Sequence, residues 1–502
     1  MSTAEIVVVL LVAVDLSFRL IALVIVPPNR RPQTSMAWLL AIFFIPFVAF
    51  LAFLAFGSHK LSPKRRRKQR AINTFLNEQA QALSPDITIT PEELSTRADT
   101  PAWLPPVVTL TNGLARLPLT RGNQIEFLDH YEGVFAQMAK DIDNATSSVN
   151  ALFYIMSTDA DTDIFFTALE DAVKRGVTVR VLFDQVATRR ITGATALIQR
   201  LKASGVEFHP MLPFEPWRGV YQRPDLRNHR KILVIDSEVA YTGSQNIIES
   251  GYRNKKHKKR GLHWHDITLR VRGPLVHSLE AVFITDWFHE TDDLLPLRPP
   301  TTTPPAKKQS TTPPAATPTT GVAQVVPSGP AMDGETNLRL FLEMMYGATK
   351  RILIVSPYVV PDDSMRYAIT SASLRGVRVD MVVSEIGDQP LVFHAQRSYY
   401  DEFLRAGVNL WWYPAPTILH PKFFVVDDQV AVIGSSNLDM RSFTLNLELT
   451  VLLVGDPAVS ELTEFGDHYI AASSQLTLDQ WRTRPRLDRI KEGLARLTAT
   501  VQ

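Results

Sequence analysis

A pattern of histidine, lysine, glycine and asparagine that occurs twice constrains this chain more than any other feature. Each copy consists of histidine, any residue, lysine, four apolar residues and aspartate, followed later by glycine, serine, any residue and asparagine. The first copy is His229, Lys231, Asp236, Gly243, Ser244 and Asn246, and the second is His420, Lys422, Asp427, Gly434, Ser435 and Asn437. Glycine follows histidine by 14 residues in both copies, which lie 191 residues apart. This matched spacing indicates a duplicated folding unit.

Each copy reads as a β-hairpin. Apolar runs at 232–235 and 239–241, and at 423–426 and 430–433, flank short polar turns. Because side chains alternate along a strand, the histidine and lysine of one copy point the same way. The Gly-Ser-x-Asn segment ends the return strand and comes back beside them. We therefore expect each copy to gather an imidazole, an ammonium, a hydroxyl and a carboxamide.

Two such copies facing each other favour phosphodiester chemistry. Cations and amides neutralise phosphoryl oxygens, one histidine attacks phosphorus, and the other protonates the leaving alcohol. A catalytic histidine also needs an acceptor for its second ring nitrogen. The candidates are Glu448, 28 residues after His420, and Asp266, 37 residues after His229. The catalytic set expected from the motif is His229, Lys231, Asp236, His420, Lys422 and Asp427. Asp236 and Asp427 fall on the opposite strand face, however, and are interpreted as structural partners at the turn.

The repeat extends beyond the motif and predicts an α/β fold. Arg175-Gly-Val-Thr-Val is echoed by Arg375-Gly-Val-Arg-Val, and Gly205-Val by Gly407-Val, each after a helix-like segment. This β-α-β rhythm predicts helices that cover a sheet. We expect a connector at 71–103, a first domain at 104–295 and a second at 322–502. Between the domains, residues 296–330 hold ten prolines, so 296–321 is predicted to be a disordered Pro/Thr linker, with 322–326 as the next strand.

Two apolar runs precede the repeat. Residues 6–26 and 36–56 are 21 residues each, long enough as helices to cross a bilayer core of roughly 30 Å. Asp15 and Arg19 lie at i and i+4 and should pair within the first run. Seven basic residues follow the second run between 60 and 70, so the positive-inside rule places both the N-terminus and the catalytic domains in the cytoplasm. We thus expect residues 1–70 to form a transmembrane hairpin with a basic flank that attracts anionic lipid.

The composition narrows the chemistry further. The chain has 502 residues and no cysteine, which excludes disulfides, thiol nucleophiles and cysteine-based metal sites. The formal net charge of only +2 argues against a nucleic-acid partner. Six of the eight residues from Arg253 to Arg260 are basic, and we interpret this segment either as a solvated loop or as a rim that meets anionic headgroups.

The paired motifs resemble those of the phospholipase D superfamily. Together with the two apolar runs, the segments Arg227-Asn-His-Arg-Lys231 and Gly434-Ser-Ser-Asn-Leu-Asp-Met-Arg-Ser442 resemble the bacterial cardiolipin synthase branch. The resemblance covers nearly the whole chain except the linker. It departs from the family pattern at Pro421, where a small residue is usual, and slightly in the first Gly-Ser-Gln-Asn.

The resemblance implies two duplicated domains with the active site between them, and conversion of two phosphatidylglycerol molecules to cardiolipin and glycerol without nucleotide or metal cofactor. His229 would form a phosphatidyl-histidine and His420 would act as acid and then as base, although the near symmetry of the motifs leaves their order open. Phosphate oxygens would be held by side chains of both copies, namely Lys231, Lys422, Ser244, Asn246, Ser435 and Asn437.

Three other functions are weighed against cardiolipin synthesis. A hydrolytic phospholipase D, or a head-group exchanger, differs only in the acceptor alcohol. A nuclease is disfavoured by the apolar runs and the modest charge. A membrane-tethered scaffold with a decayed site is disfavoured because both His-Lys-Asp sets are intact.

Overall fold

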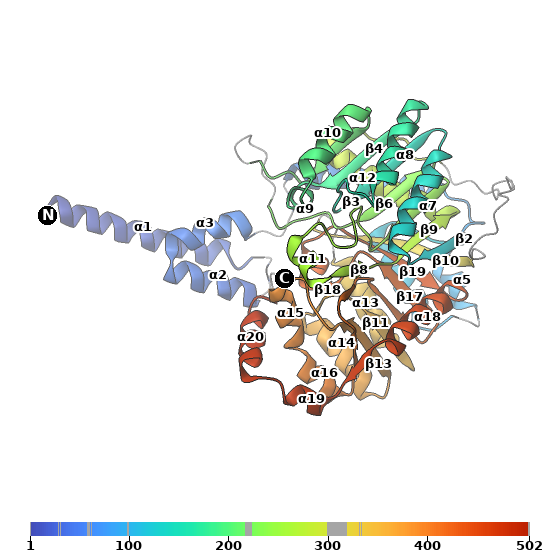
Figure 1. The fold of residues 1–502 in the computed structure, drawn as a ribbon. Coiled ribbons are helices and arrows are strands. Elements are labelled where there is room, and N and C mark those ends of the chain that lie inside the picture. The colour runs from blue at the N-terminus through green and yellow to red at the C-terminus, as the bar shows by residue number, and fades with distance from the viewer. Residues whose placement is uncertain are drawn as a thin grey trace. The chain divides into compact units, whose positions relative to one another are not determined.

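The computed structural model describes residues 2–28, 30, 32–57, 61, 63–97, 100–215, 223–298, 319–330, 332 and 334–499 (Figure 1). The chain divides into two compact units, Met1–Leu61 and Ser62–Gln502, which are described separately below. Residues 299–318, which make up most of the expected linker, lie outside the described residues.

The N-terminal unit contains three apolar helices: α1 (Thr3–Ile25), α2 (Pro32–Phe44) and α3 (Pro46–Phe56). Helix α1 begins with a capping box in which Ser2 and Glu5 bond each other's backbone N–H groups. It is the one helix among the described residues that is long and apolar enough to cross a membrane. Within it Arg19 pairs with Asp15 at 2.8 Å, as expected from their spacing.

The second apolar run is not the single 21-residue helix expected from its composition. Pro46 has no N–H to donate to a preceding turn, so the first helix ends before Ile45 and a new helix begins at Pro46. Helices α2 and α3 fold back on each other, which brings the rings of Trp38 and Phe53 to 5.6 Å. Arg30 links the C-terminal ends of α1 and α3, because it donates to the carbonyls of Val26 and Gly57 at 2.6 and 2.9 Å. The expectation of one continuous 21-residue helix is therefore wrong, and two short helices form in its place.

The second unit is built on one 16-stranded sheet whose two halves repeat the same strand order. From the centre outward, the first half runs β2 (Leu119–Leu128), β9 (Thr268–Arg272), β7 (Val239–Gly243), β6 (Lys231–Ile235), β3 (Ser148–Phe153), β4 (Thr178–Asp184) and β5 (Glu207–Met211). The second half runs β10 (Thr319–Ser328), β19 (Glu448–Val454), β17 (Val430–Gly434), β16 (Phe423–Val426), β11 (Arg351–Val355), β13 (Arg378–Ser384), β14 (Asn409–Tyr413) and β20 (Ser474–Leu476). The halves join where β2 pairs antiparallel with β10, and β1 (Thr88–Ile89) pairs with β2.

The predicted β-α-β units are present in both halves. Helix α8 (Asp163–Lys174) connects the parallel strands β3 and β4, and α14 (Asp363–Leu374) connects β11 and β13. Both strands that follow begin after a glycine with positive φ, Gly176 and Gly376, which ends the helix without strain on a side chain. The mixed α/β fold with a duplicated unit is thus confirmed.

Helices cover both faces of the sheet. One face carries α7 (Tyr131–Asp143), α8 and α10 (Ala194–Ser204) in the first half, and α6 (Leu104–Ala115), α13 (Thr336–Gly347), α14 and α16 (Tyr400–Ala406) in the second. The other face is shared by α12 (Pro274–Thr291) and α18 (Ala458–Ala471), whose apolar side chains join one core with strands of both halves. Smaller helices are α5 (Pro91–Ser95), α9 (Gln185–Arg189), α11 (Lys255–Arg260), α15 (Pro390–Arg397), α17 (Met440–Thr444), α19 (Leu478–Arg482) and α20 (Arg486–Arg496).

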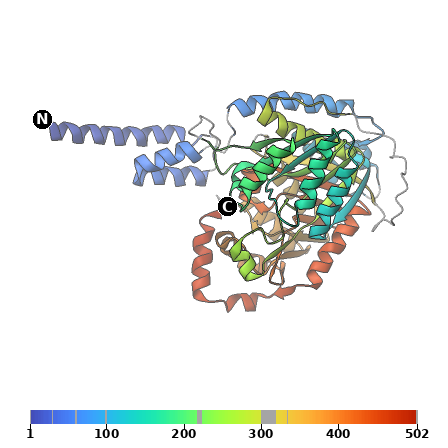
Figure 2. The same cartoon turned by 45° about the horizontal axis from the view of Figure 1, so that its top comes forward.

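The basic segment after the second apolar run belongs to the body. It forms α4 (Pro63–Ala82), which lies along α12 (Figure 2). Arg65 pairs with Glu290 at 2.7 Å, and Lys68 pairs with Asp292 at the same distance. Part of the predicted lipid-binding flank therefore compensates acidic groups of the protein itself. Arg66, Arg67 and Arg70 remain exposed, and Lys60 lies outside the described residues.

The end of the predicted linker also differs from expectation. Strand β10 begins at Thr319, so residues 319–321 belong to the sheet rather than to a disordered linker. Gly321 pairs with Asn123 of β2. The strand expected at 322–326 is confirmed and is longer than its apolar core, because pairing with β2 supplies partners for its polar first residues.

Candidate active site

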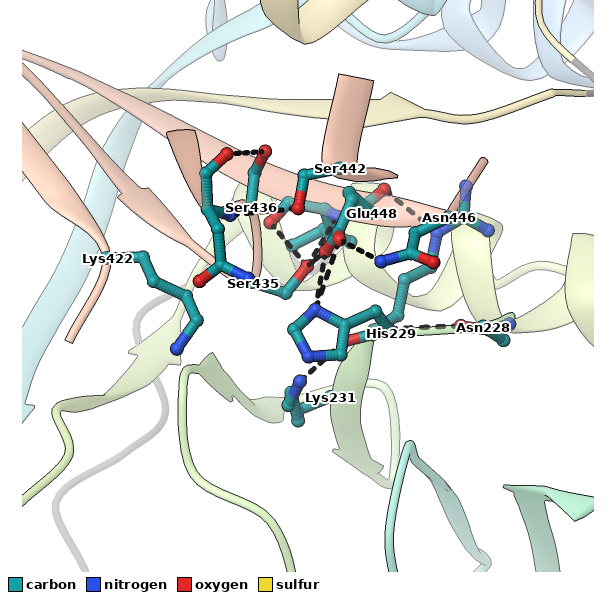
Figure 3. Close-up of polar contacts among 12 residues, drawn as sticks. Asn228, His229, Lys231, Lys422, Ser435, Ser436, Ser442, Asn446 and Glu448 are labelled. Atoms are coloured by element: carbon teal, nitrogen blue, oxygen red, sulfur yellow. Dashed lines mark hydrogen bonds and ion pairs between the residues drawn. The ribbon is translucent and has the colours of Figure 1, made fainter. Parts of the chain in front are cut away.

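His229 is held by a carboxylate from the opposite half of the sheet. It lies just before β6, and its Nδ1 is 3.0 and 3.1 Å from the two carboxylate oxygens of Glu448, the first residue of β19 (Figure 3). The backbone N–H of His229 donates to the carbonyl of Leu447 at 2.8 Å. This backbone contact places the imidazole of His229 beside Glu448, the residue after Leu447.

His420 is held in the same way with the halves exchanged. Its Nδ1 lies 2.6 Å from Oδ1 of Asp266, and its backbone N–H donates to the carbonyl of His265 at 2.8 Å. The short strands β8 (His263–His265) and β15 (Thr417–Leu419) pair in parallel, and Asp266 and His420 directly follow them. Both orienting carboxylates are fully buried.

The order of residues along the chain associates Glu448 with His420 and Asp266 with His229. In the structure each carboxylate contacts the other histidine, so this pairing by proximity in sequence is wrong. The physical reason is the exchange of backbone hydrogen bonds between halves, through the Asn228–Leu447 bridge and the β8–β15 pair. As a result, neither half of the duplicated fold contains a complete site.

Two buried lysines lie close enough to interact electrostatically with both histidines. Lys231 Nζ donates to the carbonyl of His229, and Lys422 Nζ to that of His420, both at 2.6 Å. Burial and the charge of the other lysine lower the pKa of Lys231 to about 7. Burial lowers the pKa of Lys422 to about 8, against the opposing effect of Asp266 and Glu448. A site that holds two mutually repelling ammonium groups is suited to an anion, whose charge would relieve that repulsion.

Burial favours the neutral form of both histidines. Burial lowers the pKa of His229 to about 4, although Glu448 favours the charged form. Burial also lowers the pKa of His420. At Asp266 burial alone would raise the pKa, but the contact with His420 and the charge of Lys422 outweigh it and lower the pKa of Asp266 to about 2. A neutral imidazole that donates its Nδ1–H to a carboxylate presents a lone pair at Nε2. The carboxylates therefore set the tautomer that a nucleophile requires.

The hydroxyls of the motif serines form hydrogen bonds with Glu448 or with backbone groups next to the orienting carboxylates. Ser435 Oγ donates to Glu448 and accepts from the N–H of Leu449, while Ser244 Oγ accepts from the N–H of Ile267. Their hydroxyls are thus engaged in positioning the strands that carry the orienting carboxylates. The phosphate-holding role expected for Ser244 and Ser435 has no geometric support.

The two motif asparagines differ in their availability. Asn246 Oδ1 accepts from the N–H of Ile155, and its Nδ2 donates to the hydroxyl of Tyr252 at 2.9 Å. Asn437 is 6% exposed, and within the described part of the chain its Oδ1 has no hydrogen-bond partner. The carboxamide of Asn437 is thus the less engaged of the two, and its Nδ2 is the atom that could donate to a phosphoryl oxygen.

Asp236 and Asp427 lie at the hairpin turns, away from the histidines. The carboxylate of Asp236 accepts the N–H groups of residues 146–148 at 2.7–2.8 Å, and Asp427 accepts those of residues 349–351 at 2.7–2.8 Å. Both have positive φ, with a second positive-φ residue following, as a type I′ turn requires. Their inclusion in the catalytic set is therefore wrong. Their interpretation as turn residues agrees with these contacts, since they anchor the starts of β3 and β11.

Two arginine–aspartate pairs beneath His229 were missed by the sequence reasoning. Arg230 makes two bonds to Asp286 of α12 at 2.8 and 2.9 Å, and Arg227 lies 3.0 Å from Asp184 at the end of β4. All four side chains are buried. The Arg-x-x-Arg spacing around His229 was visible, but the partners are distant in the sequence.

Tyrosines flank both histidines and were likewise missed. Tyr154 packs edge-on against His229 with ring centroids 4.7 Å apart, and Tyr358 does so against His420 at 6.5 Å. Each tyrosine follows the innermost parallel strand of its half, β3 or β11. Among the described residues, no group of three or more histidine, aspartate or glutamate side chains could hold a metal ion.

Comparison with known proteins agrees with this duplicated site. The family model described as "Cardiolipin synthase, PLD-like domain" matches residues 138–287 and 341–469, and the one described as "Phospholipase_D-nuclease N-terminal" matches residues 7–58. The solved structure of phosphatidylserine synthase from Haemophilus influenzae has the same fold, with a TM-score of 0.55, 16% identity, and coverage of 79% of this chain and 100% of that one. These matches define a phospholipase D-like fold with two copies of the catalytic unit.

Full-length relatives narrow the assignment. Cardiolipin synthase A of Proteus mirabilis is 34% identical over 469 residues, covering 93% of this chain and 92% of that protein. Cardiolipin synthase A of Serratia proteamaculans is 30% identical over 474 residues, covering 94% of each. This chain belongs to the cardiolipin synthase family of the phospholipase D superfamily.

Proposed function

We propose that this chain is a cardiolipin synthase that transfers a phosphatidyl group from one phosphatidylglycerol to another and releases glycerol. The observation that carries the proposal is the crossed pair of histidine–carboxylate contacts around two buried lysines. Such a site would bind one phosphodiester and offer it a nucleophile and an acid. Membership of the cardiolipin synthase family and phosphatidylglycerol's anionic headgroup support this substrate.

The first half-reaction would consume one phosphatidylglycerol. Nε2 of His229 attacks phosphorus, an N–P bond forms, and the P–O bond to the glycerol headgroup breaks. His420 gives its proton to the departing oxygen, and glycerol leaves. The anionic phosphate between Lys231 and Lys422 cancels their repulsion, which favours a protonated His420 once the substrate is bound.

The second half-reaction would restore the enzyme. His420, now neutral, takes the proton from a glycerol hydroxyl of a second phosphatidylglycerol, and that oxygen attacks phosphorus. The N–P bond breaks, cardiolipin is formed, and His229 becomes free again. Lys231, Lys422 and the carboxamide of Asn437 would hold the phosphoryl oxygens in both steps.

The activity can be tested with purified protein and phosphatidylglycerol as the only lipid. Equal molar amounts of cardiolipin and glycerol should form, and a chelator should leave the rate unchanged. Phosphatidic acid as the main product, under conditions in which the protein remains folded, would instead identify a hydrolase. The His229→Ala variant is the control for contaminating activity.

We also propose that α1 crosses the bilayer while α2 and α3 enter and leave it on one side. Helix α1 has 23 residues, about 35 Å, whereas α2 and α3 have 13 and 11, about 20 and 17 Å. The bonds of Arg30 to Val26 and Gly57 support this path, because they bring the ends of α1 and α3 together. The body would then lie on the cytoplasmic side with the exposed basic residues of α4, and the N-terminus on the other side.

Cysteine labelling can test this orientation, because the chain contains no native cysteine. Single Thr3→Cys and Ser474→Cys variants in sealed vesicles should react with a membrane-impermeant maleimide from opposite sides. Both should react after detergent is added. Labelling of both from the same side would support two full spans and refute a returning α2–α3 hairpin.

We further propose that the duplicated domains occupy residues 104–295 and 322–502, after a connector at 71–103. The matched strand order of the two halves and the family matches at 138–287 and 341–469 support these boundaries. The crossed contacts imply that the two domains act together as one catalytic unit.

A further inference from the structure

The last helix, α20, carries its apolar side chains on the outside. Leu487, Ile490, Leu494 and Leu497, directly after the helix, are 60, 59, 62 and 78% exposed. Their spacing of three, four and three residues puts them on one face of the helix. Figure 1 shows α20 at the edge of the body, beside α15.

The opposite face of α20 attaches to the body through a small side chain and an ion-pair network. Ala495 is buried, as is Glu492, whose carboxylate accepts from Arg397 of α15 at 3.2 Å and from Arg484 at 2.9 Å. A surface helix of a soluble protein normally turns its apolar face inward and its charges outward. Since α20 does the reverse at these positions, the described residues of the body do not bury the apolar stripe.

The charges beside the stripe indicate what covers it. At 100° per residue, Arg486 and Lys491 fall on its two edges. Basic residues that border an apolar face are the pattern of a helix lying in the headgroup region of an anionic membrane. The same chain carries the apolar helix α1, so a bilayer is present where this protein works.

Neighbouring elements extend the same kind of surface toward the active site. Leu391 of α15, the helix on which α20 is anchored, is 51% exposed. Three residues before α15, the carbonyl of Gly387 accepts from Arg260 of α11 at 3.2 Å. The other basic residues of α11 are exposed lysines: Lys255, Lys256, Lys258 and Lys259. Helix α11 leads directly into β8 and the Asp266 that holds His420.

We propose that α20 lies in the interface of an anionic bilayer with its four apolar side chains in the acyl region, as a membrane contact additional to residues 1–61. The basic residues of α11 would meet headgroups along the same surface. The proposal is independent of the transfer reaction, because it concerns where the body touches lipid. It gives the catalytic body a fixed orientation to the membrane that holds its substrates.

Spin labelling of the full chain tests the proposal. Leu494→Cys lies in the stripe, and Arg489→Cys is the matched control on an exposed polar position of the same helix. With a nitroxide on each variant in phosphatidylglycerol vesicles, the label at 494 should be accessible to oxygen and shielded from a water-soluble nickel chelate. The label at 489 should show the opposite preference. In phosphatidylcholine vesicles the label at 494 should become more accessible to nickel.

Three results would overturn the proposal. Equal nickel access at 494 and 489 would show that the stripe faces water. Shielding of position 494 from both oxygen and nickel, with dipolar broadening between labels, would show that a second copy of the chain covers it. An identical depth in neutral and anionic vesicles would remove the role assigned to the basic residues. Both substitutions are at exposed positions, so neither should prevent folding.

Discussion

Replacing His229 by alanine should abolish phosphatidyl transfer, with kcat lowered by about 10⁴-fold or more. In the proposed mechanism the variant loses the ring nitrogen that bonds to phosphorus. His420→Ala should lower turnover to a similar degree for a different reason. It should still form the N–P bond with an activated lipid, but it lacks the base for the second half-reaction.

The two variants can be separated by trapping the intermediate. Labelled phosphatidylglycerol, or an analogue whose leaving alcohol is already acidic, should leave label on His229 in His420→Ala. No label should remain on the protein in His229→Ala. Label found on His420 in the His229→Ala variant would reverse the proposed order of the two histidines. Unchanged lipid turnover in both would refute the enzyme assignment.

The crossed carboxylates give the second large effect. Glu448→Gln and Asp266→Asn should each lower kcat by between about 10²- and 10⁴-fold, because an amide can stabilise the wrong tautomer of its histidine. Since Glu448 contacts His229 and Asp266 contacts His420, the two variants should fail at different steps. Glu448→Gln should slow formation of the phosphatidyl-histidine, whereas Asp266→Asn should let it accumulate on His229.

Rapid-quench measurement of labelled enzyme would separate these steps. Thermal melts would show whether the loss of a buried charge has unfolded either variant. Accumulation in Glu448→Gln instead would have two meanings, which the position of the label separates. Label on His420 would mean that the two histidines act in the reverse order, whereas label on His229 would mean that each carboxylate serves the histidine of its own half, contrary to the crossed geometry. Ser435→Ala offers a milder control, since Ser435 donates to Glu448 without contacting His229. It should shift the pH profile of the first step more than it lowers the maximal rate.

Much of the fold could be predicted because its signals are local. The apolar runs around Asp236 and Asp427 alternate with turn residues, and they form the two hairpins at nearly the expected positions. The Arg-Gly-Val echoes mark where a helix ends and a parallel strand begins. Such patterns depend on neighbours within a few residues, and a single sequence records them directly.

Contacts between distant segments could not be predicted in the same way. The second apolar run has the composition of a membrane span, but Pro46 and the contact between Trp38 and Phe53 turn it into a hairpin. The basic residues of α4 match the positive-inside rule, yet Arg65 and Lys68 are paired with acidic groups that follow more than 220 residues later. Composition records a charge but not its partner.

The sequence by itself determined the chemical groups of this protein: two imidazoles, two ammonium groups, their carboxylate candidates, and an α/β duplication to carry them. The tertiary structure alone decided which carboxylate serves which histidine, because that depends on backbone pairing of β8 with β15 and of Asn228 with Leu447. It also decided that Ser435 supports Glu448, and that the apolar stripe of α20 faces outward. Side-chain types are fixed by the chain, whereas their partners are fixed by hydrogen bonds and packing between segments far apart in it.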